Sequence, residues 1–219
     1  MRLSPGAATR RRSPQPSSPR LTTRYPAVRA AAVYEFGPEE GEALRALARD
    51  DGDPRVRRAA VTRIDDIAVL ADVARTDPDE EVRVEAVRGL AGLAAEADDV
   101  SAAAESVRQL LSLGRTKEVV LVARASTSVA VRAAVVDLLD DPKALGSVTR
   151  HAQDHATRLR ALARIADGEE LVAVALKAEH TDVAVAALER INGVESLTAI
   201  AQRARNKVAA RRARTKLRA

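Results

Sequence analysis

One unit recurs along most of this 219-residue chain. An apolar residue that opens each copy returns at steps of 26, 23, 26, 26, 26 and 26 residues. The opening residues are Leu44, Leu70, Leu93, Val119, Leu145, Leu171 and Leu197. A chain with this kind of period folds by stacking its units, because each unit buries its apolar face against the next. We therefore expect one elongated body rather than a single closed core.

Each unit has the apolar spacing of two short helices. Counted from the opening residue, apolar side chains fall at offsets 0 and 3 and then at 12, 16, 17 and 20. This spacing puts them on one face of each of two helices, with a turn between the helices. Helices of about ten residues are too short to be stable alone, so they must be stabilised by stacking. The sequence predicts an all-α fold, a right-handed α-α superhelix of about seven short helical hairpins.

Turn residues support the same division of the unit. Asp53-Pro54 and Asp77-Pro78 are each typical of an N-cap followed by proline at the first helical position, so we expect second helices to begin there. Gly168 and Asn192-Gly193 fall between units, where we expect a left-handed residue to end a helix.

The third unit departs from the pattern. It follows the second unit after a deletion of three residues, and it has Glu96, Glu105 and Gln109 where the other units have apolar residues. A change of this kind predicts a bend, a loosely packed unit or a functional site.

The chain divides into three regions by composition. Residues 1–29 have seven arginines and no acidic residue, and we expect a disordered basic tail rich in proline and serine. A targeting segment or a wrongly assigned start codon is the alternative. Residues 30–38 contain Tyr34 and Phe36, and we expect an N-terminal cap there, with an aromatic binding patch as the alternative. Residues 39–219 form the repeat array, which ends in a basic capping helix.

Composition also limits the location of the protein. The chain has no cysteine, which rules out disulfides and thiolate metal sites and favours the cytoplasm. No apolar run approaches the roughly 20 residues that span a bilayer, so we expect no membrane insertion.

Several segments resemble a known class of repeat. DPRVRRAAVTRI, DPDEEVRVEAVRGL, VAVRAAVVDLL and TRLRALARIADGEELVAVAL resemble HEAT-like repeats of the compact bacterial kind. ALERINGVESLTAIAQRARNKVAARRARTKL resembles the end of the repeat region in the bacterial domain-of-unknown-function family 349. The resemblance covers Glu39 to Leu217 and implies an armadillo-like helical solenoid that acts as a scaffold. Members of family 349 carry long charged coiled-coil segments after the repeats, and this sequence does not contain such segments. A leucine-rich-repeat variant, with one helix of each pair tightened to a 3-10 turn, is the alternative.

The same resemblance implies a structural ladder. HEAT-like repeats commonly pair an aspartate in the turn with an arginine in the second helix, and these pairs run through the stack. The matching pairs are Asp53 and Arg57, Asp79 and Arg83, and Asp154 and Arg158. Ser128 with Arg132 keeps half of the pattern, whereas His180 with Ala184 and Asn206 with Ala210 lose it. We expect these pairs to be charge-assisted hydrogen bonds that stabilise the stack.

The sequence offers no set of residues suited to catalysis, and we expect neither an active site nor a cofactor. No serine lies in a strand-turn-helix elbow, and the glycines are dispersed instead of forming a phosphate-binding loop. His151 and His155 could hold a metal together with His180 of the next unit. Because His155 falls in the predicted turn, we expect solvated turn residues and no metal site. An enzyme with its site in the third unit is a distant alternative.

A basic stripe closes the array. Lys207, Arg211, Arg214 and Arg218 follow the spacing i, i+4, i+7 and i+11 and therefore share one face of a helix. The stripe predicts either a polar cap on the end of the stack or contact with an anionic partner. We expect a non-enzymatic scaffold that binds protein partners. The alternative is a nucleic-acid- or ribosome-associated protein that contacts phosphates through its basic ends.

Overall fold

The computed structural model describes residues 23–218, and this part of the chain is helical throughout. It contains fourteen α-helices and one short 3-10 helix, with no β-strand among the described residues. The predicted all-α fold is therefore confirmed. The chain forms two compact units, one ending at Ile64 and the other beginning at Asp65, whereas the sequence predicted one continuous body. Predictions for residues 1–22 lie outside the described residues. No helix within 23–218 is both long and apolar enough to cross a bilayer.

The first unit begins with a helix that the sequence did not predict. Its elements are α1 (Pro26–Val33), η1 (Pro38–Glu40), α2 (Gly41–Asp50) and α3 (Pro54–Val61). Proline at the first position starts α1, which packs against α3. The cap therefore begins at Pro26, inside the segment 1–29 that was predicted to be disordered. It includes helix α1 and is longer than the predicted segment 30–38.

The two aromatic residues of the cap separate. Phe36 is buried at 6% exposure, whereas Tyr34 is 61% exposed, so they do not form a joint binding patch. The backbone carbonyl oxygens of both residues accept hydrogen bonds from the Arg63 guanidinium at 3.1 and 3.0 Å. Arg29 of α1 donates to both carboxylate oxygens of Asp51 at 2.8 and 2.7 Å. Burial alone would raise the pKa of Asp51, but its bonds to Arg29 and to the backbone hold the pKa below its ordinary value.

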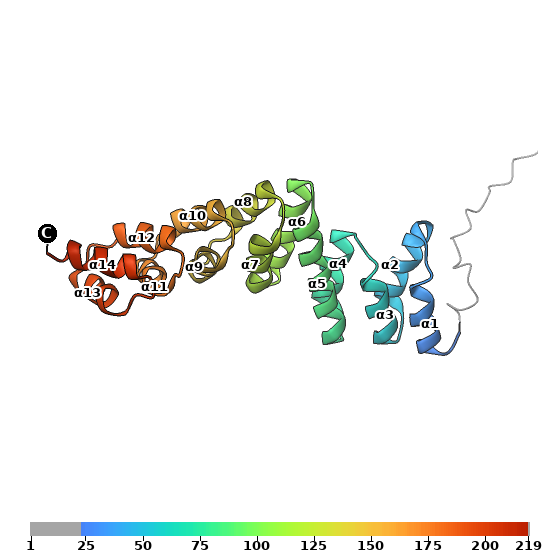
Figure 1. The fold of residues 1–219 in the computed structure, drawn as a ribbon. Coiled ribbons are helices and arrows are strands. Elements are labelled where there is room, and N and C mark those ends of the chain that lie inside the picture. The colour runs from blue at the N-terminus through green and yellow to red at the C-terminus, as the bar shows by residue number, and fades with distance from the viewer. Residues whose placement is uncertain (1–22, 219) are drawn as a thin grey trace, which may run out of the picture. The chain divides into compact units, whose positions relative to one another are not determined.

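The second unit stacks its helices in two layers (Figure 1). Its helices are α4 (Ile67–Thr76), α5 (Glu80–Glu96), α6 (Val100–Ser112), α7 (Thr116–Ala125), α8 (Val129–Leu138), α9 (Pro142–His151), α10 (His155–Arg164), α11 (Gly168–Lys177), α12 (Thr181–Glu189), α13 (Val194–Arg203) and α14 (Lys207–Lys216). The first helices α7, α9, α11 and α13 contact one another in order and form one layer. The second helices α6, α8, α10, α12 and α14 form the other in the same way.

The predicted apolar columns form the core between these layers. In the second compact unit, which begins at Asp65, the residues at offset 3 of each first helix are at most 3% exposed, as the helical spacing predicted. They are Val73, Val122, Val148, Val174 and Ile200. Burial of each such side chain contributes roughly 1.5–3 kcal/mol, which short helices could not obtain without their neighbours. Leu139 and Ile165 are buried where a described repeat follows them, whereas Leu217 in the same column is 37% exposed.

The third repeat is irregular because two helices have fused. The deletion removes the residues that correspond to Asp140, Asp141 and Pro142, which separate α8 from α9. Without a capping aspartate or a proline, the helix continues, and α5 serves as the second helix of one repeat and the first helix of the next. The array therefore has a 17-residue helix at this point, and the third repeat has no separate first helix.

Helix α6 also differs in the face that it buries. It begins at Val100 behind the N-cap Asp99 and buries Ala103, Val107 and Leu110, spaced i, i+4 and i+7. Glu105 and Gln109 consequently lie on a half-exposed face, where the Gln109 amide donates to the Glu105 carboxylate at 2.9 Å. The polar residues Glu105 and Gln109 therefore do not interrupt the apolar core, because α6 buries residues at other offsets.

Three of the four predicted turn signals were wrong in detail. Asp53 and Pro54 do begin α3, but α5 is capped by Asp79, and Asp77 ends α4. Gly168 is the first residue of α11, and Gly193 is the N-cap of α13 with φ −67, so neither is left-handed. Among the described residues the one positive-φ position is Gly114, at φ 69. It ends α6 in a Schellman motif, with Gly114 N donating to the Leu111 oxygen and Arg115 N to the Leu110 oxygen.

Candidate functional site

A row of arginines on the second helices is the most ordered polar feature of the chain. We call Arg57, Arg83, Arg132 and Arg158 the turn arginines. Each one donates to a backbone carbonyl oxygen in the turn of its own hairpin, six residues earlier, at 2.7 to 3.1 Å. Three of them also reach the carbonyl oxygen five residues earlier. These carbonyl groups follow the end of the first helix, where the backbone lacks helical partners and the helix dipole favours a cation.

The hydrogen-bonded pairs predicted for Asp53, Asp79 and Asp154 do not form, because each aspartate has other partners. Each of these aspartates caps the start of its own helix by accepting from backbone amides. Asp53 also pairs with the Arg55 guanidinium, and this hydrogen bonding lowers the pKa of Asp53 to about 2. In place of the predicted pair within one hairpin, Asp154 caps its helix and Arg158 donates to carbonyl oxygens of the turn.

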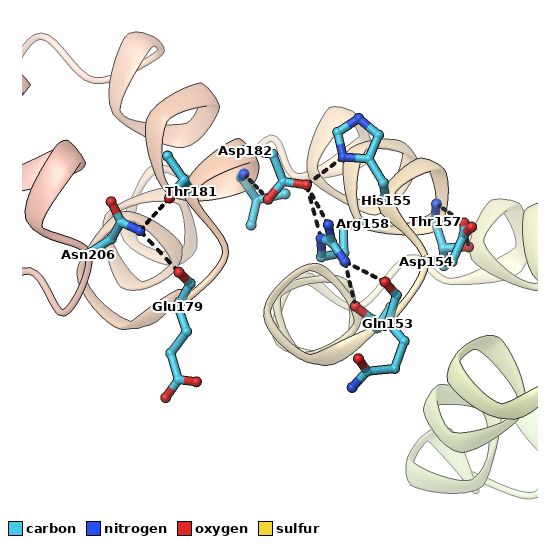
Figure 2. A network of polar contacts seen from close by, with 11 residues as sticks. Gln153, Asp154, His155, Thr157, Arg158, Glu179, Thr181, Asp182 and Asn206 are labelled. Carbon is cyan, nitrogen blue, oxygen red and sulfur yellow. Dashed lines mark hydrogen bonds and ion pairs between the residues drawn. The ribbon is translucent and has the colours of Figure 1, made fainter.

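Two of the turn arginines, Arg132 and Arg158, connect one repeat to the next, as Figure 2 shows for Arg158. Arg158 donates through Nε and Nη2 to a single carboxylate oxygen of Asp182 on α12, at 3.1 and 2.7 Å. Arg132 reaches the following repeat in the same way, donating to the Thr157 hydroxyl at 3.1 Å with Asp154 at 3.5 Å. Burial tends to raise the pKa of Asp182, but hydrogen bonds from Arg158 and its neighbours hold this pKa below the ordinary value.

At the turn of the sixth repeat, an amide from the seventh repeat takes the place of the missing arginine. Asn206 caps α14 through its side-chain oxygen, and its Nδ2 donates back to the Glu179 carbonyl oxygen and the Thr181 hydroxyl at 3.0 and 2.9 Å. The Glu179 carbonyl group occupies the same turn position as that of Gln153, which accepts from Arg158 (Figure 2). The turn of the sixth repeat therefore keeps a side-chain donor, although the sequence predicted that His180 with Ala184 loses the pattern.

A second row of cations was missed by sequence reasoning. We call Arg63, Arg164, Arg190 and Lys216 the outer cations; each lies at offset 19 of its repeat. Every one of them donates to backbone carbonyl oxygens near the end of the helix 25 to 29 positions earlier in the chain. Lys216, for example, bonds to the Ile191 and Glu189 oxygens at 2.7 and 3.2 Å. The recurrence of a cation at one fixed offset was the signal that could have revealed them.

The third repeat has neither a turn arginine nor an outer cation. By offset from the opening residue, Ser106 aligns with the turn arginines and Ser112 with the outer cations. Because α6 begins at an earlier offset, Ser106 instead lies seven residues after its N-cap Asp99, the buried position that Val135 and Ala161 hold in other second helices. The Ser106 hydroxyl is fully buried and has no hydrogen-bond partner among the described residues. A hydroxyl without a base beside it has no activated form, so this buried serine does not build a nucleophilic site.

The three histidines do not come together around one point. His155 contacts the Asp182 carboxylate through Nδ1 at 2.6 Å, and His180 is the N-cap residue of α12. The pKa of His151 is lowered, first by burial and then by nearby arginines. The described residues contain no group of three or more side chains arranged to hold a metal ion.

The basic stripe lies on the exposed side of α14, but its members are not equivalent. Arg214 donates to the Ala201 carbonyl oxygen at 2.8 Å. Lys207, Arg211 and Arg218 are exposed, and their side chains make no hydrogen bond or ion pair with any described residue. Arg214 stands in a column whose other members, such as Val136 and Leu162, are buried by the next repeat, so it provides a polar end to the stack.

No protein-family model matches this chain, and no curated protein is significantly similar to it in sequence. The HEAT-like relationship thus stays a prediction from the residues quoted above.

Proposed function

We propose that the chain is a non-enzymatic scaffold that binds protein partners on the outward face of its second helices. One observation carries this proposal: three consecutive second helices, α8, α10 and α12, share an apolar, partly exposed face. Its residues are Ala130, Ala133, Ala134, Ala156, Leu159, Ala163, Val185 and Ala186.

The shape and surroundings of this face support protein binding. Small side chains let a partner approach the helix backbones closely, and apolar surface released from water favours association. Ion pairs between neighbouring helices border the face, with Arg160 bonded to Asp137 at 2.9 Å and Arg212 to Glu189 at 3.2 Å. An apolar centre with a polar rim is the usual anatomy of a protein interface. The absence of cysteine from the sequence favours the cytoplasm as the compartment.

The test introduces three charges into the face. A130E, A156E and A163E alter exposed alanines of α8 and α10, and the control A46E, A125E and A166E adds the same charge at exposed alanines elsewhere. Each tagged protein is cross-linked in the cells that express it and purified. We expect partners that wild type and control recover to fall at least about tenfold with the face variant, since burying an unpaired charge is costly. Equal recovery with the face variant, or no partner for wild type, would refute the proposal.

A further inference from the structure

The end of the array is strongly basic in a way that its structural role does not require. Residues 203–219 have eight lysines or arginines and no acidic side chain, whereas residues 30–202 have 21 basic and 31 acidic residues. A stack needs a polar outer face at its end, but acidic or neutral polar residues would satisfy this need as well. The sign of the charge is therefore the feature to be explained.

The structure divides the eight cations into two groups of four. Arg205, Arg212, Arg214 and Lys216 bond to carboxylates or carbonyl oxygens of the preceding helices. Arg203, Lys207, Arg211 and Arg218 are exposed, and their side chains have no bonded partner among the described residues. Structural contacts account for the four cations of the first group, but not for the four of the second group.

Two of these unpaired cations, Lys207 and Arg211, lie at positions where a positive charge destabilises helix α14. Lys207 is the first residue of α14, where the positive end of the helix dipole disfavours a cation. Lys207 and Arg211 stand at i and i+4, a spacing at which like charges repel. Residues that break local rules without a compensating contact are expected at functional sites.

The chemistry of this face selects among anionic partners. A stable protein interface needs an apolar or aromatic centre, and of the large apolar residues in α14 and its C-cap only Leu217 is prominently exposed, at 37%. Single-stranded nucleic acid is held largely by stacking on aromatic side chains, and the sequence has no aromatic residue after Phe36. A phosphodiester duplex requires neither, because its backbone is bound by cations alone.

The length of the row fits a duplex backbone. Arg218 lies eleven positions after Lys207, in the turn that follows the end of α14 at Lys216, so the row spans about 16 Å at the helical rise. A strand of a duplex presents about one phosphate per 3.4 Å along the axis, so this length faces roughly five phosphates. We propose that Lys207, Arg211 and Arg218, together with Arg203, form a binding site for the phosphate backbone of double-stranded nucleic acid, without sequence preference. This site is independent of the protein-binding face proposed above.

The test measures how duplex binding depends on salt. Fluorescence anisotropy follows the full chain with labelled random-sequence DNA and RNA duplexes, in a background where Arg10, Arg11 and Arg12 are changed to Gln so that these basic residues contribute less. The site variant is K207Q, R211Q and R218Q. The matched control is K117Q, K143Q and K177Q, which removes the same charge at exposed lysines of α7, α9 and α11.

Counterion release sets the expected size of the effect. With four phosphate contacts, affinity should fall about 150-fold between 50 and 200 mM salt, and with the single contact left in the site variant about 4-fold. The control should keep the steeper dependence. Tighter binding of DNA or of RNA identifies which nucleic acid supplies the backbone. No binding at 20 mM salt, the same salt dependence in the site variant and the control, or equal competition by polyglutamate of matched charge would overturn the proposal.

Discussion

Replacing Arg158 by alanine should weaken the stack more than any surface substitution nearby. The Arg158 side chain is 9% exposed, and it donates to Asp182 and to the carbonyl oxygens of Ala152 and Gln153. Alanine removes the guanidinium from all three acceptors, and Asp182 keeps only its bonds to His155 and to the Val183 amide. Hydrogen bonds to a charged group contribute about 1.5–3 kcal/mol each, and breaking a buried ion pair costs about 3–5 kcal/mol. Because these figures overlap, we expect a total of about 3–5 kcal/mol.

Arg160 provides the matched control for this substitution. It lies two residues away on α10 and also bonds to an aspartate of a neighbouring helix, with side-chain exposures of 48% and 43% for Arg160 and Asp137. An exposed ion pair of this kind contributes about 0.2–1 kcal/mol because water screens it. Arg160→Ala should therefore cost several times less than Arg158→Ala. The two variants remove the same side chain and differ in burial and in the carbonyl bonds.

Urea unfolding followed by far-ultraviolet circular dichroism measures the difference. The midpoint for Arg158→Ala should fall by about 1.5 M relative to wild type, and that for Arg160→Ala by less than about 0.5 M. Arg158 joins α10 to α12, so amide hydrogen exchange should quicken mainly in α11 to α14, on the far side of the broken contact. If Arg158→Ala costs no more than Arg160→Ala, the turn arginines do not hold the stack together.

Three further outcomes follow from single residues. Ser106→Ala should raise the thermal midpoint by a few degrees, because it removes a fully buried hydroxyl without a partner at a gain of about 1 kcal/mol; a lower midpoint would contradict this. Gly114→Ala should cost about 1–2 kcal/mol in urea unfolding, because its φ of 69 is strained for a residue with a Cβ, and an unchanged midpoint would contradict it. Arg158 and its neighbours hold the pKa of Asp182 below the unfolded value of about 3.9, so its contribution is present above that pH and is lost as pH falls through the lower folded pKa. Asp182→Asn should therefore flatten the decline of the urea midpoint below about pH 4, and an equally steep decline would disprove the linkage.

Capping residues show how far local sequence chemistry could be read. Asp53 and Pro54 begin α3 as predicted, because a cap depends only on neighbours within a few residues. Asp77 and Asp79 compete for the same role two residues apart, and the choice of Asp79 was not decided by the motif. The fused helix α5 was signalled by the deletion, but a bend, a loose unit and a site were equally compatible with that signal.

The candidate sites were less predictable than the fold. The exposed position of Lys207, Arg211 and Arg218 follows from their helical spacing alone, whereas the bond that removes Arg214 from the free group depends on where α13 ends. The sequence identified the turn arginines, but it predicted the wrong acceptors for them. Arg158, for example, bonds to Asp182 and not to Asp154.

What the sequence by itself determined is the repeat length, the helical class and the buried columns, because apolar spacing and capping act between residues close together in the chain. Only the tertiary structure decided which acceptors the arginines use and that Lys216 and the other outer cations donate to carbonyl oxygens at the ends of earlier helices. It also decided that Ser106 of α6 is buried in the core. These features depend on which groups the stacking of one repeat on the next brings within hydrogen-bonding distance. A bond across some 25 residues leaves no mark in local periodicity, so it appears only once the layers are packed.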